Sequence, residues 1–230
     1  MAFCFNYEPF IAIIGDIVQS REISDRKETQ NKLKAILDNI NRKYADEIAS
    51  KFMITLGDEF QGLLRCGKNI LDIIDEIETG MYPISLRFGI GIGEMDTDIN
   101  FDMPLGSDGP AYHNARKMID EIKIKENRYE TDYSNIMIWA QGENEHTAML
   151  LNSIISLCSA LKSKWTSRQK EIISCYLESD KNQYTTAEKL GINQTSVHRA
   201  LDLSKYYTYQ NAIDIVKSTL REIKRNDDDV

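Results

Sequence analysis

The order of short apolar segments in the first 93 residues constrains the fold more than any other feature of this chain. An Ile-rich run at residues 10–17, FIAIIGDI, has the length of a buried strand. A helix is expected to follow, because Asp25 and Glu28 have the form of a capping pair and apolar residues then recur at helical spacing. The next segments are a hairpin at residues 52–56 and 60–64, a helix at 69–78 and a strand at 86–93.

Strand, helix, hairpin, helix and strand in this order predict an α+β fold, with a ferredoxin-like antiparallel sheet and helices on one of its faces. In such a sheet the end of the first strand lies beside the tip of the hairpin. We therefore expect Asp16 and Asp58 to converge although they are far apart in the sequence. In the last strand, LRFGIGIG, the three glycines share one face, where we expect them to allow a close backbone approach.

The rest of the chain predicts a second, smaller, all-helical domain. After a helix at 111–124 and a strand at 135–140, a long helical stretch begins near residue 142. Three short helices follow at residues 165–179, 186–190 and 194–203. The predicted organisation is a first domain at residues 1–142, a connecting helix at 143–164 and a helical domain with an acidic tail at 165–230.

The formal charge of −8 over 230 residues conceals two oppositely charged parts. Residues 1–159 carry 16 bases and 26 acids, whereas residues 160–225 carry twelve bases and seven acids, which indicates different partners for the two parts. The 42% apolar content excludes a disordered chain, and no apolar run approaches the ~20 residues that span a bilayer. With no basic residue before the first apolar stretch, as a secretory signal would have, we expect a cytoplasmic protein without a membrane partner.

Paired carboxylates are the first candidate for chemistry. Two carboxylates held close together repel, so a fold usually neutralises them with a divalent cation. Asp16 and Asp58, with the backbone carbonyl of Ile17, would offer hard oxygen ligands to Mg²⁺ or Mn²⁺. Taken singly, each aspartate also has a structural explanation, as a helix cap or as part of a hairpin turn.

A phosphorylated ligand would suit the surroundings of these carboxylates. Ser20 and Arg21 stand at the start of the first helical region, where backbone N–H groups can bind phosphate, and Gly57 and Glu59 flank Asp58. Arg116 is a second candidate for neutralising phosphate charge, since its planar fork suits bidentate contacts.

Four stretches that occur in order resemble the SatD family, a group of bacterial and archaeal proteins. They are residues 14–21 (IGDIVQSR), 55–62 (TLGDEFQG), 87–93 (RFGIGIG) and 106–116 (GSDGPAYHNAR). More distantly, the first domain is similar to the palm-like catalytic domain of class III nucleotide cyclases and GGDEF diguanylate cyclases. This resemblance implies two metal ions held at Asp16 and Asp58 and binding of a nucleotide.

The purine-reading residues of those cyclases are absent. Tyr112 and Ile54 replace the Asn and Lys of class III cyclases, and Leu56 replaces a glycine of GGDEF enzymes. The resemblance therefore supports binding of a phosphorylated ligand better than cyclase activity on ATP or GTP. The expected substitute ligand contacts lie on and before one helix: Asp108, Tyr112, His113, Asn114 and Arg116.

The C-terminal helices have the spacing of a helix-turn-helix. Ala187, Gly191 and Val197 supply a small residue where two helices touch, a glycine for the turn and an apolar anchor. The segment resembles the helix-turn-helix of sigma-factor region four. The residues expected to face DNA bases are Gln194, Thr195, Ser196, His198 and Arg199, and those expected to meet phosphates are Lys189 and Lys205. A solvated polar face is the alternative interpretation of these residues.

Three functions remain open at this point. The first is a cytoplasmic regulator, expected to be a homodimer, in which the first domain senses a metal-bound phosphorylated ligand and the helix-turn-helix binds DNA. The second is a nucleotidyl-transfer enzyme in which two metal ions at Asp16 and Asp58 activate phosphates and Arg116 acts as a catalytic residue. The third is a protein-interaction scaffold in which neither site is used.

Overall fold

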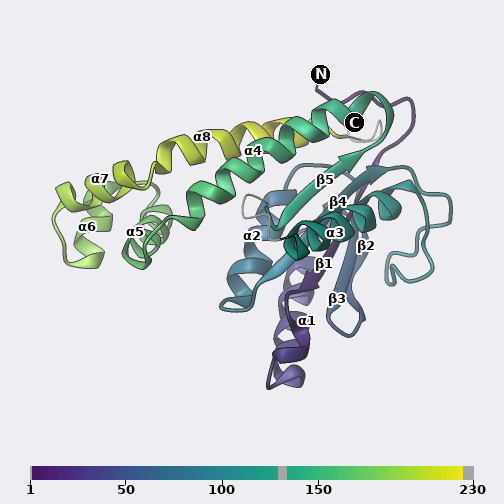
Figure 1. The fold of residues 1–230 in the computed structure, drawn as a ribbon, viewed down its shortest axis with the longest axis horizontal. Coiled ribbons are helices and arrows are strands. Elements are labelled where there is room, and N and C mark those ends of the chain that lie inside the picture. Colours follow the sequence, from purple (N-terminus) through teal and green to yellow (C-terminus); the bar gives the residue numbers. More distant parts are fainter. Residues whose placement is uncertain (1, 129–133, 225–230) are drawn as a thin grey trace.

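A five-stranded sheet forms the centre of the larger part of the protein (Figure 1). The computed structural model describes residues 2–128 and 134–224, so the acidic tail predicted at residues 227–229 lies outside the described residues. The strand order is β2-β3-β1-β4-β5. The strands are β1 (Phe10–Ile17), β2 (Ile48–Leu56), β3 (Glu59–Leu64), β4 (Leu86–Gly93) and β5 (Ile136–Ala140).

The first four strands form the antiparallel arrangement that the segment order predicts. Central strand β1 pairs antiparallel with β3 on one side and with β4 on the other, and β2 pairs with β3 as a hairpin. Strands β1 and β4 have the predicted bounds. Strand β2 begins at Ile48, four residues before the predicted start at residue 52.

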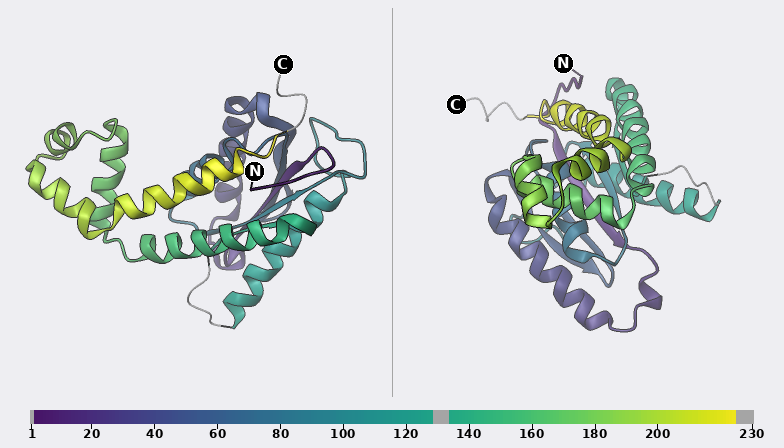
Figure 2. Two further views of the ribbon diagram at one scale, coloured as in Figure 1. Left: turned by 90° about the horizontal axis from the view of Figure 1, so that it is seen from above. Right: turned by 90° about the vertical axis from the view of Figure 1, so that its left-hand side faces the viewer.

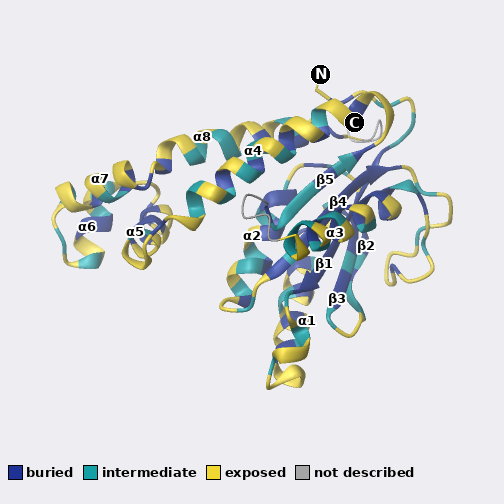
Figure 3. Cartoon of the chain, viewed as in Figure 1, coloured by how far each residue is buried: buried dark blue, intermediate teal, exposed yellow. Residues whose placement is uncertain are grey.

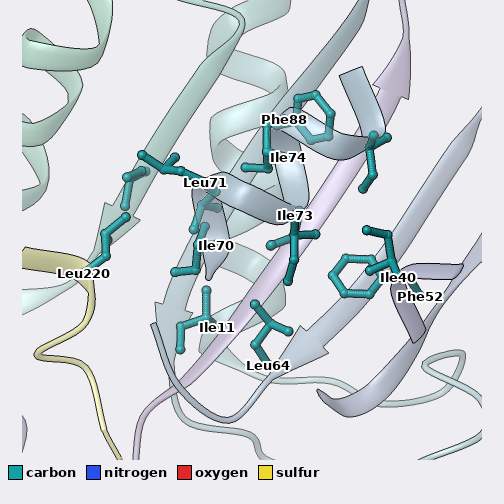
Figure 4. Packing of buried hydrophobic residues seen from close by; sticks show 14 of the residues in the cluster. Ile11, Ile40, Phe52, Leu64, Ile70, Leu71, Ile73, Ile74, Phe88 and Leu220 are labelled. Atoms are coloured by element: carbon teal, nitrogen blue, oxygen red, sulfur yellow. The ribbon is translucent and has the colours of Figure 1, made fainter. Parts of the chain in front are cut away.

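Helices α1 (Arg26–Lys43) and α2 (Ile70–Met81) cover one face of the sheet. The Asp25 side chain caps α1 by accepting a hydrogen bond from the backbone N–H of Glu28 at 2.8 Å, as the capping pair predicts. The apolar residues of both helices meet the odd-numbered residues of β1. Figure 4 shows part of this core, including Ile11, Ile40, Phe52, Leu64, Ile70, Ile73 and Phe88.

Helix α3 (Pro110–Asn127) covers the opposite face and lies directly on the glycines of β4. A Cβ atom added to Gly91 would lie 2.0 Å from the carbonyl oxygen of Ala111, and one added to Gly89 would lie 2.1 Å from that of Ala115. These distances confirm the predicted close backbone approach. A second apolar cluster fills the space beside these contacts and includes Ala12, Ile14, Ala115 and Ile119.

The prediction of an antiparallel sheet with helices on one face is wrong in two respects. Strand β5 pairs parallel to β4, so the sheet is mixed, and α3 occupies the face expected to be free. The two corrections have one cause. A helix that crosses over the sheet returns the chain to the end where β4 began, and the strand that follows then runs parallel to β4.

A pair of long helices, α4 (Glu145–Ser163) and α8 (Tyr206–Leu220), extends from the sheet to a small helical unit (Figures 1 and 2). This distal helical unit consists of α5 (Ser167–Glu178), α6 (Gln183–Leu190) and α7 (Gln194–Leu203). Three short 3-10 helices join other elements: η1 (Ser20–Glu22), η2 (Ala45–Glu47) and η3 (Gly142–Asn144). Buried residues concentrate in the sheet and its covering helices (Figure 3).

Helix α8 was not predicted from the sequence. It returns the chain to the core formed by the sheet with α1 and α2. Val216, Leu220 and Ile223 are fully buried in the cluster built by the sheet with α1 and α2, and Figure 4 shows Leu220 beside this cluster. The backbone N–H of Gly67 also donates to the carbonyl of Ile223 at 2.9 Å. The domain bounds 1–142, 143–164 and 165–230 stay a prediction, and the last of these ranges contains a helix that packs on the first.

The N-terminal segment, residues 2–7, is bonded to the residue that precedes α4. The side chain of Asn144 exchanges two hydrogen bonds with the backbone of Cys4, at 2.8 and 2.7 Å, and Phe3 is buried in the main core. Among the described residues, no helix is both long and apolar enough to cross a membrane.

Candidate functional site

The end of β1 and the tip of the β2–β3 hairpin are neighbours, as the order of the segments predicts. Asp16 stands opposite Glu59 in the β1–β3 register, and the backbone N–H of Ile17 donates to the carbonyl of Asp58 at 3.2 Å. The backbones of the two predicted carboxylates are therefore adjacent. Their side chains, however, have different partners.

The carboxylate of Asp16 lies between the sheet and α3 and is buried. Arg87, its register partner on β4, donates from Nη1 to Asp16 Oδ2 at 2.6 Å, and Lys123 of α3 places its Nζ 3.2 Å from the same oxygen. Arg87 also donates from Nε to Glu126 Oε2 at 2.8 Å. Burial alone would lower the pKa of Arg87, but its hydrogen bonds to Glu126 and Asp16 outweigh this and raise the pKa.

Arg116 of α3 is paired with Glu59, which is buried on the same face. The guanidinium forms a bidentate pair, with Nη2 donating to Glu59 Oε1 at 2.5 Å. The hydrogen bonds to Glu59 raise the pKa of Arg116 more than burial lowers it. A phosphate that used Arg116 would have to compete with this carboxylate.

Asp58 lies at the hairpin tip near the start of α1. The hydroxyl of Ser20 donates to its carboxylate, and Gln30 donates from Nε2 to the carbonyl of Gly57 at 2.6 Å. Asp58 and Ser20, together with Ile17, line a hollow of about 10 Å³, which has room for about one water molecule. Asp16 is not among the residues that line this hollow.

The two aspartates therefore do not form one metal site in this arrangement. Asp16 is already neutralised by Arg87 and Lys123 on the side of α3, whereas Asp58 is turned toward Ser20 near α1. Within residues 2–128 and 134–224, no group of three or more His, Cys, Asp or Glu side chains is arranged to hold a metal ion. The donor set does not fit the expected Mg²⁺ or Mn²⁺ pair.

The expected ligand contacts on α3 point in several directions. Tyr112 is buried in the apolar cluster beneath the helix, and burial raises its pKa. Asn114 is also buried and donates to the carbonyl of Ile92 at 2.9 Å, while His113 contacts Asp108 at 2.7 Å on the exposed surface. Of this group, Arg116 alone reaches the region of Asp16 and Glu59, and Arg21 is exposed on η1. The ligand roles of all these residues stay predictions.

Sequence reasoning gave no role to the basic residues that neutralise Asp16. Arg87 stands in the apolar run of β4 on the same face as the glycines, where a charge must find a partner. Lys123 lies two turns after Arg116 on α3, so helical spacing places both basic groups along one side of the helix. These two signals were present in the sequence, but the partner of each depends on how α3 crosses the sheet.

The profile of the SatD family matches residues 10–217 of this chain. The chain belongs to the SatD family. No curated protein matches it.

The solved structures that are similar to this SatD-family chain include a cyclase catalytic core and an expression regulator. The catalytic core of a rhodopsin-guanylyl cyclase with converted specificity, in complex with ATPalphaS, is 19% identical with a TM-score of 0.37. The matched region covers 49% of this chain and 72% of the cyclase chain. A regulator of polyketide synthase expression from Bifidobacterium adolescentis is 12% identical with a TM-score of 0.24, covering 92% of this chain and 86% of its own. Neither likeness carries an argument about the function of the SatD-family chain.

Proposed function

We propose that this SatD-family protein is a DNA-binding regulator that contacts DNA through α6, α7 and the turn between them. The observation that carries the proposal is the geometry of this pair. Gly191 ends α6 in the left-handed conformation, with φ 62° and ψ 35°, and α7 begins three residues later at Gln194. A tight turn of this kind between two short helices supports the helix-turn-helix expected from the sequence.

The interior of the distal helical unit supports the same interpretation. Ala187 and Val197, the small residue and the apolar anchor expected from the sequence, are both buried in one cluster with residues of α5. Trp165 closes this cluster, with its indole N–H donating to the carbonyl of Ser204 at 2.8 Å. The packing buries one side of α7 and leaves the other side exposed.

The exposed side of α7 carries the polar residues that could read base edges. Thr195, His198 and Arg199 are exposed, and Ser196 is exposed but also bonds the cap residue Asn193. Gln194 is half-buried because it donates to Gln183 of α6 at 2.5 Å. Lys189 is exposed near the end of α6, and Lys205 is exposed between α7 and α8; phosphate contacts are expected at both.

Binding as a homodimer fits the modest positive charge of this part of the chain. Leu150 and Leu157 of α4 and Ile215 of α8 are 62%, 68% and 50% exposed, so the paired helices have apolar side chains available to a second copy. Two distal units would double the number of phosphate contacts. Light scattering coupled to gel filtration should report twice the mass of 26.4 kDa.

A phosphorylated ligand sensed by the first domain is the second part of the proposal. Arg87, Arg116 and Lys123 are gathered on one side of α3, and each is paired with a carboxylate that a phosphate could replace. The expectation of Mg²⁺ or Mn²⁺ gains no support from the arrangement of Asp16 and Asp58, and the proposal does not depend on a metal ion. Calorimetric titration of nucleoside phosphates with and without Mg²⁺ tests both expectations.

Nucleotidyl transfer is the competing function. It requires two metal ions between Asp16 and Asp58, and the separate partners of these side chains argue against it. Incubation with Mn²⁺ and each nucleoside triphosphate distinguishes the two functions, because turnover occurs only in the enzyme.

DNA binding can be tested by fluorescence anisotropy with DNA selected from a random pool. The Arg199→Ala variant should weaken binding by about tenfold, equivalent to ~1.4 kcal/mol. The matched control is Arg42→Ala, which removes an exposed arginine of α1. Affinity should also fall steeply as salt is raised. Equal loss in both variants, or binding insensitive to salt, would refute the proposed contact surface.

A further inference from the structure

A cavity lies at the end of the sheet opposite Asp16, where the parallel strands β4 and β5 both finish. It measures about 540 Å³, within the range of small-molecule sites. Glu94 follows β4, Pro110 begins α3, and Gln141 and Glu143 follow β5, and all four line the cavity. The carboxyl ends of parallel strands joined by a crossover helix are where α/β sheets commonly bind ligands.

The N-terminal segment forms the remaining wall. Phe5 and Tyr7 line the cavity, and their rings lie 5.4 Å apart between centroids. The segment is held in place by the two hydrogen bonds between Cys4 and Asn144 at the start of α4. The cavity therefore has a fixed aromatic side, which comes from a part of the chain far from β4 and β5 in the sequence.

The charge of the lining is negative. Glu94 and Glu143 are exposed, and neither forms an ion pair within the described residues. No lysine, arginine or histidine is among the described residues that line the cavity. The pKa of Tyr7 is raised by burial and by the charge of Glu94, in keeping with a carboxylate close to the ring.

The start of α3 does not offer the N–H groups that an anion would need. Pro110, the first residue of the helix, has no N–H, and the N–H of Ala111 is donated to the carbonyl of Glu94 at 3.3 Å. Asn144 has its side-chain oxygen and nitrogen bonded to the backbone of Cys4. The start of α3 and the side chain of Asn144 therefore offer no free donor to an anion, and the charge of Glu94 and Glu143 disfavours one.

We propose that this cavity binds a small organic cation, an amine or guanidinium compound, through Glu94 and Glu143, with its charge or alkyl chain against Phe5 and Tyr7. Carboxylates satisfy the N–H donors of such a cation, and aromatic faces attract its charge. The volume suits a ligand of several heavy atoms better than a bare metal ion. The site lies at the root of α4, and it is separate from the region proposed to sense phosphate.

Isothermal titration with three probes of equal chain length tests the chemistry. Cadaverine, 1,5-pentanediol and glutarate share a five-carbon chain and end in ammonium, hydroxyl and carboxylate groups. The buffer should be phosphate, because Tris is itself an organic cation. Saturable binding of cadaverine alone is the expected result. Absence of cadaverine binding, or equal binding of the diol or of glutarate, overturns the proposal.

Variants locate the binding. The Glu94→Gln, Glu143→Gln double variant should weaken cadaverine binding by at least ~10-fold, because each lost carboxylate removes a charge-assisted hydrogen bond. Glu145→Gln, an exposed neighbour outside the lining, is the control and should change the affinity little. The Gln141→Glu variant adds a third carboxylate and should tighten binding. An unchanged dissociation constant in both the double variant and Gln141→Glu refutes the site.

Discussion

The Gly91→Ala substitution tests whether α3 rests directly on the backbone of β4. The added Cβ would lie 2.0 Å from the carbonyl oxygen of Ala111 and 2.2 Å from the backbone nitrogen of Ala115, whereas real Cβ atoms essentially never come closer than 3.0 Å. The helix would have to retreat by about 1 Å. Because both atoms belong to the helix backbone, no side chain can rotate away to relieve the contact.

The expected loss of stability follows from two opposing effects. Overpacking a core costs about 1–3 kcal/mol when side chains can adjust, and a backbone contact belongs at the upper end, near 3 kcal/mol. Replacing a glycine also restricts the unfolded chain, which returns about 0.4–1 kcal/mol. The net loss in the free energy of unfolding should be about 2 kcal/mol, together with a weakening of the contacts that α3 makes with Asp16 and Glu59.

Urea unfolding followed by circular dichroism measures this loss. Two further variants calibrate it. A Cβ atom added at Gly93 would lie 2.8 Å from the backbone nitrogen of Ala111, so Gly93→Ala should lower the free energy of unfolding less than Gly91→Ala. A Cβ atom added at Gly106 would meet nothing within 4 Å, so Gly106→Ala should cost only about 1 kcal/mol, from its φ of +89°. If the free energy of unfolding of the Gly91→Ala variant is within about 0.5 kcal/mol of that of the unmodified protein, α3 does not lie directly on β4.

Three other substitutions address different contacts. Gly67→Ala should release the end of α8 and lower the free energy of unfolding by about 2–3 kcal/mol, because its Cβ would lie 1.9 Å from the carbonyl oxygen of Leu220. Faster hydrogen exchange confined to residues 213–223 would show this release, and unchanged exchange would contradict it. Glu59→Gln leaves the partly exposed Arg116 without its ion pair, so urea unfolding should show a loss of about 1–2 kcal/mol that is absent in an Arg116→Ala background. Burial raises the pKa of Glu78 above its ordinary value of 4.5, so the folded state loses stability as pH rises from that value through the folded pKa. The Glu78→Gln variant should therefore be more stable than the unmodified protein at pH 7 and equally stable below about pH 4. A gain in stability that persists at low pH would contradict burial of the charge as the cause.

Local patterns predicted most of the elements of the first domain. The FIAIIGDI and LRFGIGIG runs correspond to β1 and β4 with the expected bounds, because both strands are buried and end where the apolar pattern ends. Helix α8 was missed because its buried residues, among them Val216 and Leu220, are interrupted by exposed polar ones. Their partners lie in α4 and in a core built mostly by residues more than a hundred positions earlier. Such a pattern can be recognised as the buried side of a helix only when the core that it contacts is known.

The candidate site divides in the same way. Pairing of backbones at Asp16 and Asp58 follows from strand order, which the segment pattern predicts. The direction of each side chain does not follow, because Asp16 faces α3 by strand alternation whereas Asp58 stands in a turn, where alternation no longer applies. The position of α3 then decides that Lys123 lies beside Asp16 and that Arg116 lies beside Glu59.

By itself the sequence determined the order of the first four strands, the glycine face of β4 and the turn at Gly191, since each depends on residues close together in the chain or on a backbone freedom that glycine alone supplies. Only the tertiary structure decided that β5 is parallel, that α8 returns to the first core and that the paired aspartates have separate partners. These features depend on where a helix crosses the sheet, which is set by the packing of residues distant in sequence.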